Sequence, residues 1–67
     1  MFASKIKWLM REKKITVRAL AERADISIVT INKARQDSGI SECRLSTLGR
    51  IAQALEVKTK DLYEEED

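Results

Sequence analysis

Apolar residues recur along most of the chain at spacings of three and four, which is the period of an α-helix packed along one side. We expect helices over residues 2 to about 13, 16–24, 27–35 and 45–55, and a final short helical turn from Lys58 or Thr59. The apolar stripes consist of Phe2, Ile6, Leu9 and Met10; Leu20, Ala21 and Ala24; Ile31 and Ala34; and Leu45, Leu48, Ile51, Ala52 and Leu55. The pattern therefore predicts a compact all-α domain of five helices.

The polar residues between the stripes mark where the helices begin and end. Thr16 and Ser27 each precede a stripe and offer a side-chain oxygen that can cap a helix. Asp25 stands where a tight turn is needed, and Asp tolerates the left-handed backbone region better than most residues. Residues 36–44 have no clean period and include Gly39, so we expect a loop there. Gly49, inside the fourth helix, costs about 1 kcal/mol relative to Ala.

Length and composition limit the function. The 67 residues, 43% hydrophobic and 36% charged, suit one small domain over residues 1–67 with little room for a ligand pocket or a separate dimerisation domain. The chain has no His, and its lone Cys43 cannot form an internal disulfide. We expect no metal, cofactor or small-molecule ligand, and an enzyme is the weakest class. Neither a signal peptide nor a membrane-spanning run is visible, so we expect a cytoplasmic protein.

The charges are unevenly distributed. Residues 1–60 hold all 13 Lys and Arg and six of the 11 acidic residues, a net charge of +7, whereas residues 61–67 hold the other five acids. A basic body followed by an acidic tail, which we place at about residues 64–67 and expect to be frayed, suits a polyanionic partner. The same charges would also serve as an ordinary solvated face.

The second and third expected helices are joined by a turn of three or four residues, and Ser27 caps the second of the pair. This is the geometry of a helix-turn-helix, in which Ala21 is small enough for a close crossing. The chain here resembles the lambda-repressor-like (Xre/Cro-type) helix-turn-helix DNA-binding family. The resemblance extends from about Ile6 to Leu62, through Ile15-Thr16, Leu20-Ala21-Glu22, Ile26-Ser27, Thr30-Ile31, residues 48–55, Val57 and Asp61-Leu62.

The resemblance implies that the helix over residues 27–35 enters the major groove of double-stranded DNA and that its exposed side chains meet base edges. Ile28 and Val29 would pack on thymine methyl groups, or else form a protein interface or plain surface. Lys33 would donate to guanine O6 and N7, or else contact a phosphate. Asn32 would pair with adenine or reach the backbone. These four residues are the candidate base contacts.

The resemblance also implies contacts to the DNA backbone. The candidates are Thr16, Arg18, Ser27, Thr30, Arg35 and Arg44. Ser27 would serve as a helix cap alone or as a cap that also meets a phosphate, and Thr30 would meet a phosphate or be partly buried. For the others a solvated position is the alternative. Asp25 stands where the family usually has Gly, and Val17 where it often has a phosphate-binding Gln.

Two functions from different classes fit these features. The first is a sequence-specific transcriptional regulator, a repressor that occupies operator DNA, acting as a homodimer formed in solution or on DNA only. Its dimer surface would involve the C-terminal turn and Trp8. Trp8 is either packed against the C-terminal segment or exposed, and an exposed Trp8 would indicate a subunit contact. Of the two we favour partial burial against Leu62 or Tyr63. The second is an antitoxin-like or adaptor protein whose Ile28–Val29 surface mainly binds a protein.

Overall fold

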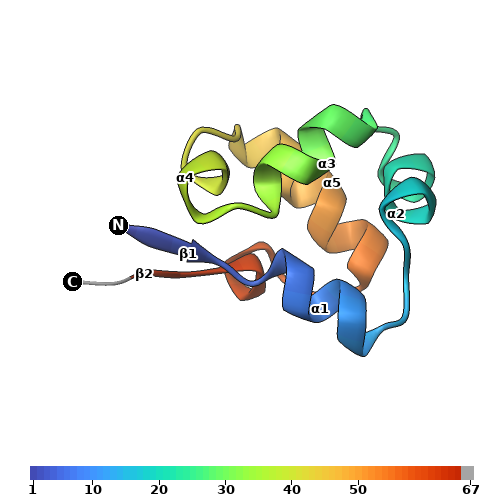
Figure 1. The fold of residues 1–67 in the computed structure, drawn as a ribbon, viewed down its shortest axis with the longest axis horizontal. Coiled ribbons are helices and arrows are strands. Elements are labelled where there is room, and N and C mark those ends of the chain that lie inside the picture. The colour runs from blue at the N-terminus through green and yellow to red at the C-terminus, as the bar shows by residue number, and fades with distance from the viewer. Residues whose placement is uncertain (66–67) are drawn as a thin grey trace.

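The computed structural model describes residues 1–65 and consists mainly of helices (Figure 1). The α-helices are α1 (Ile6–Glu12), α2 (Val17–Ala24), α3 (Ile28–Ala34), α4 (Asp37–Ile40) and α5 (Leu45–Leu55). A 3-10 turn, η1 (Thr59–Leu62), follows α5, and the short strands β1 (Phe2–Ser4) and β2 (Tyr63–Glu65) flank the helices. The predicted five-helix, all-α class is confirmed. The fifth α-helix is α4, which the sequence did not predict, and the helical turn expected after α5 is the 3-10 turn η1.

The strands are the main departure from the predicted fold. β1 and β2 pair in an antiparallel register that joins Phe2 with Glu65, Ala3 with Glu64 and Ser4 with Tyr63, and they lie side by side at one end of the molecule in Figure 1. The first helix therefore begins at Ile6 rather than near Phe2. Residues 64 and 65, expected to be frayed, belong to β2 because backbone pairing and the edge-to-face packing of Phe2 on Tyr63 hold them. The rest of the expected acidic tail, residues 66–67, lies outside the described residues.

β1 is also fastened to the end of α3. The Ser4 hydroxyl donates to the carbonyl oxygen of Ala34 at 2.7 Å. The Ser4 backbone N–H donates to the Asp37 carboxylate at 2.8 Å. The N-terminal strand thus braces the junction between α3 and α4.

Three helices end in the same left-handed turn. The turn residues are Lys14, Asp25 and Glu56, with φ between 54° and 59°. In each case an N–H after the helix reaches a carbonyl five residues back, at 2.9–3.0 Å: Ile15 to Met10, Ile26 to Ala21 and Val57 to Ala52. This hydrogen bond is the Schellman pattern, which usually uses Gly. The turn predicted at Asp25 is confirmed, and the fold accepts a side chain at all three positions.

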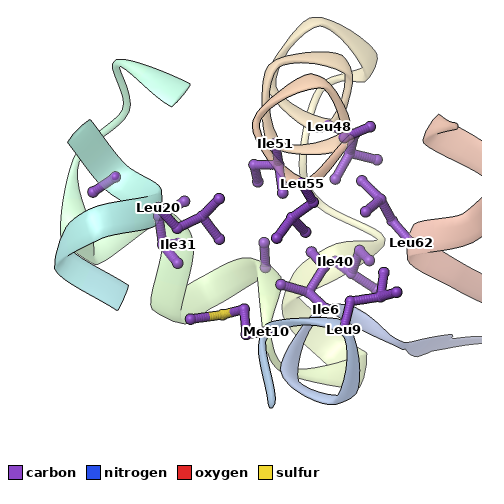
Figure 2. Close-up of a cluster of buried hydrophobic side chains, with 13 residues drawn as sticks. Ile6, Leu9, Met10, Leu20, Ile31, Ile40, Leu48, Ile51, Leu55 and Leu62 are labelled. Atoms are coloured by element: carbon purple, nitrogen blue, oxygen red, sulfur yellow. The ribbon is translucent and has the colours of Figure 1, made fainter. Parts of the chain in front are cut away.

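The core lies between α1, α5 and η1, with α2 to α4 closing the remaining sides (Figure 2). The largest of the fully buried side chains are Ile6, Leu20, Ile31, Ile51, Leu55 and Leu62. Among residues 1–65 no polar or charged residue is buried. The core is therefore purely apolar, and its stability derives from removing hydrocarbon from water.

Trp8 lies outside this core. Its side chain is 53% exposed and its ring lies 5.7 Å from the ammonium of Lys5. The expected partial burial against Leu62 or Tyr63 is therefore wrong, because Trp8 projects from the side of α1 opposite the stripe that Ile6 and Met10 bury. Within residues 1–65, every helix falls short of the length and apolar character needed to cross a bilayer.

The segment over residues 36–44, predicted as a loop, contains α4. Gly39 of this helix packs against the backbone of Lys33 so closely that a Cβ would overlap the Lys33 carbonyl oxygen and lie 2.8 Å from its carbon. The N–H groups of Glu42 and Cys43 then donate to the carbonyl oxygens of Gly39 and Ile40, each at 3.1 Å. Residues 37–43 are therefore a fixed part of the fold.

The two glycines should respond oppositely to substitution. We expect Gly39→Ala to destabilise the protein by about 1–3 kcal/mol or more, because α4 must move away from α3. Gly49→Ala should instead stabilise it by about 0.5–1 kcal/mol, since a Cβ at Gly49 meets nothing within 4 Å and Ala favours the helix. Urea denaturation of both variants measures the two effects, and an equal response at the two sites would contradict the close contact at Gly39.

Candidate nucleic-acid interface

The helix pair α2–α3 begins at two hydroxyl caps. The Thr16 hydroxyl oxygen accepts from the Ala19 N–H at 3.1 Å, and the Ser27 hydroxyl oxygen accepts from the Thr30 N–H at the same distance. The hydroxyls of Ser27 and Thr30 also lie 2.9 Å apart. Each cap satisfies an N–H that has no partner within its own helix. Both predicted caps are thus present, and the side chains of Thr16 and Ser27 remain exposed.

α3 is anchored by one side and exposed on the others. Ile31 and Ala34 are completely buried, which fixes the rotation of this seven-residue helix. Ile28 and Val29 are consequently 43% and 78% exposed, and Asn32 and Lys33 are also exposed. The structure therefore gathers all four predicted base-contacting residues on the outer surface of α3.

Two of these polar side chains already have partners. The Lys33 ammonium forms an ion pair with the Glu42 carboxylate at 3.1 Å. The Asn32 side-chain oxygen accepts from a terminal guanidinium nitrogen of Arg35 at 3.0 Å. Both pairs are in solvent, where such interactions contribute little, so either can be exchanged for a ligand.

The predicted backbone-contacting residues fall into separate places. Arg18 is exposed in the first turn of α2, next to Thr16, and Thr30 is half-buried behind Ser27. Arg35 is half-buried at the end of α3, and its Nε is enclosed with no hydrogen-bond partner. Arg44 is exposed and immediately precedes α5, so it lies beyond α4 and outside the group around Thr16.

Two basic residues of α1, Lys7 and Arg11, complete a group that the sequence did not indicate. One surface hollow is lined by Lys7, Met10, Arg11, Ile15, Thr16, Val17 and Arg35. An adjoining hollow is lined by Lys7, Asn32, Arg35 and Gln36. Neither lining includes an acidic residue. Within residues 1–65, Lys7, Arg11 and Arg35 form no ion pair. The spacing of four between Lys7 and Arg11 places them on one face of α1, which is the only signal the sequence carries for them.

Cys43 lies behind the Lys33–Glu42 ion pair. Its half-buried thiol donates to the Gly39 carbonyl oxygen at 3.4 Å. Burial raises the pKa of the Cys43 thiol, the positive charge of Lys33 lowers it, and the negative charge of Glu42 raises it again. Burial is the largest of these effects, so the pKa of the Cys43 thiol is raised and the protonated form is favoured. No group of acidic or Cys side chains in the described part of the chain is arranged to hold a metal ion.

Comparison with known proteins identifies a family for this arrangement. The sequence profile of the Cro/C1-type HTH DNA-binding domain matches residues 5–67, which is nearly the whole chain. The resemblance found in the sequence is thereby confirmed. No curated protein matches the chain.

The charges around Cys43 allow the ion pair to be tested in solution. Glu42→Gln should lower the pKa of the Cys43 thiol, because it removes a negative charge, whereas Lys33→Gln should raise it. The rate of thiol alkylation as a function of pH measures both shifts. If the titration midpoint moves in neither variant, Lys33 and Glu42 do not lie beside Cys43 in solution.

Proposed function

Because the chain belongs to the Cro/C1-type HTH DNA-binding domain family, we propose that it is a sequence-specific regulator that inserts α3 into the major groove of double-stranded DNA. Bound there, it represses transcription by occupying the operator. The observation that carries this proposal is the exposed Ile28–Val29 pair on a helix whose opposite side is fully buried. Two large aliphatic side chains in water at the start of α3 match the methyl groups that thymine presents in the major groove.

The polar neighbours of this pair complete the proposed contacts. Asn32 lies one turn after Ile28 and reads adenine, and Lys33 lies one turn after Val29 and reads guanine. Thr16, Arg18, Ser27 and Thr30 meet phosphates at the start of the two helices, and Arg44 meets one near α4. Lys7 and Arg11 join Arg35 as further phosphate contacts, since the three cations surround hollows without an acidic residue.

A homodimer is part of the proposal. Regulators of this kind read two half-sites about one helical turn apart, which requires two copies of the reading helix. The exposure of Trp8 supports a subunit contact on α1, because aromatic side chains are enriched at protein interfaces. The dimer forms either in solution or on DNA only, and analytical ultracentrifugation distinguishes the two.

Binding of a protein partner is the second candidate function, and a separate observation supports it. Leu45 is 74% exposed beside an apolar hollow lined by Phe2, Ile40, Ser41, Cys43, Leu48 and Tyr63. This hollow lies away from the hydroxyl caps of α2 and α3. An adaptor or antitoxin-like protein would use such a surface together with Ile28 and Val29.

Selection from a randomised pool of double-stranded DNA, at two salt concentrations, tests the proposed function. We expect an enriched palindrome with salt-sensitive binding. Ile28→Ala and Val29→Ala should then relax the preference at a thymine by about 1–3 kcal/mol, roughly five- to 150-fold. Salt-sensitive binding without an enriched sequence would indicate a non-specific binder. No binding at all would favour the protein partner.

Substitutions of Ser27 separate capping from phosphate contact. Ser27→Ala should destabilise the protein by about 0.5–2 kcal/mol because the cap is lost. Ser27→Asp should preserve stability, since Asp caps equally well, but it should weaken DNA binding by on the order of tenfold through repulsion of the phosphate. Urea denaturation and a binding titration measure the two properties. Wild-type affinity in a stable Ser27→Asp variant would show that Ser27 is a cap only.

A further inference from the structure

Three basic side chains meet between α1 and α3 without an acidic neighbour. Lys7 and Arg35 line both of the adjoining hollows there, and Arg11 lines one of them. Neither lining includes an Asp or Glu, and within residues 1–65 the three cations form no ion pair. Like charges that are held near one another repel, so this part of the surface attracts an anion.

A second basic hollow, between α2 and α5, contains its own counter-charge. Arg23 and Arg50 line it together with Asp25. The Asp25 carboxylate lies 3.8 Å from the Arg50 guanidinium, and the Asp25 carbonyl oxygen accepts from the same group at 3.5 Å. The described part of the chain thus supplies negative charge to the hollow between α2 and α5 and none to the hollows between α1 and α3.

Arg35 is the least solvated of the three cations. It is half-buried, whereas Lys7 and Arg11 are exposed, and within residues 1–65 its enclosed Nε has no hydrogen-bond partner. One terminal nitrogen of Arg35 donates to the side-chain oxygen of Asn32 at 3.0 Å, but this acceptor is neutral and leaves the charge unbalanced. A partly buried guanidinium in this position is stabilised by an anion nearby.

The linings favour an anion that carries several acceptor oxygens. Thr16 adds an exposed hydroxyl to one hollow, and Asn32 and Gln36 add side-chain amides to the other. A tetrahedral oxyanion offers acceptors in several directions, and a planar guanidinium binds two oxygens at once. Such an ion is small enough for a surface hollow, whereas a larger ligand would need the enclosed pocket for which the chain is too short.

We propose that the two hollows between α1 and α3 form one binding site for a phosphate-type oxyanion, which a free ion fills when no DNA is bound. In the complex a backbone phosphate takes its place, so free phosphate and DNA compete. The anion joins the charges of Lys7 and Arg11 on α1 to that of Arg35 at the end of α3. The binding of a free ion goes beyond the proposed function, and only the competition with DNA rests on it.

Thermal unfolding of the whole chain in inorganic phosphate, with sodium chloride reduced to keep the ionic strength constant, tests the binding of a free ion. We expect the melting temperature to rise along a saturable curve, by about 6–11 °C at about ten times the dissociation constant, because the ion binds the folded chain only. Lys7→Gln combined with Arg11→Gln should move the midpoint to about tenfold more phosphate. Both side chains are exposed, so the double variant should fold.

The matched control is Arg23→Gln combined with Arg50→Gln, which removes two exposed cations from the hollow that contains Asp25. It should keep the wild-type midpoint. A rise that does not saturate in the wild type overturns the proposal, since phosphate would then act as a general stabilising salt. The wild-type midpoint in the variant that lacks Lys7 and Arg11 overturns it as well.

A DNA titration at constant ionic strength tests the competition. Phosphate at about ten times its dissociation constant should weaken wild-type binding to the DNA site enriched in the selection by about tenfold. The variant that lacks Lys7 and Arg11 should lose this dependence on phosphate. Unchanged affinity in a wild type that binds DNA overturns the shared occupancy. A wild type that phosphate stabilises but that binds no duplex contradicts the proposed function, and the competition with it, while the site for a free ion stands.

Discussion

The contact between Gly39 and the Lys33 carbonyl is the constraint on which the path of the chain after α3 depends. The backbones of α3 and α4 approach so closely there that a Cβ atom would not fit between them. The positions of residues 37–43 depend on this approach. Asp37 reaches the strand β1, Glu42 returns to Lys33, and Cys43 covers the Gly39 carbonyl. A segment without any hydrophobic period is thus as well defined as the helices around it.

Most of the helical fold could be predicted because its signals are local. Thr16 and Ser27 cap the helices that their positions indicate, and the apolar stripes of α2 and α3 are buried as expected. The stripe of α5 is buried except for Leu45, the first residue of the helix, which is 74% exposed although the pattern predicted it to be buried. The strands could not be predicted in this way. Each strand has only three residues, which is too short to show a period. Phe2 stands four residues before Ile6 and so fits the helical stripe, and the partner of β1 lies at the other end of the chain. α4 escaped prediction because its four residues include Gly39, which ordinarily marks a turn.

The candidate site was predictable to the same extent. The exposure of Ile28, Val29, Asn32 and Lys33 follows from the rotation that Ile31 and Ala34 impose on α3, and a helical period is enough to derive it. The partners of these residues depend on tertiary packing instead. Only the folded chain places Lys7 and Arg11 of α1 beside Arg35. Glu42 likewise stands nine positions after Lys33, and α4 is what brings them together.

The pairing of Phe2 with Glu65 also has a kinetic consequence. It closes a loop that spans nearly the entire chain, and the entropy lost in closing a flexible loop of that length is about 4 kcal/mol, before any constant term. Helices built on local contacts form sooner than such a closure. We therefore expect the two strands to pair last during folding. Because Ser4 of β1 bonds to Ala34 and Asp37, the end of α3 gains these two hydrogen bonds only at that last step.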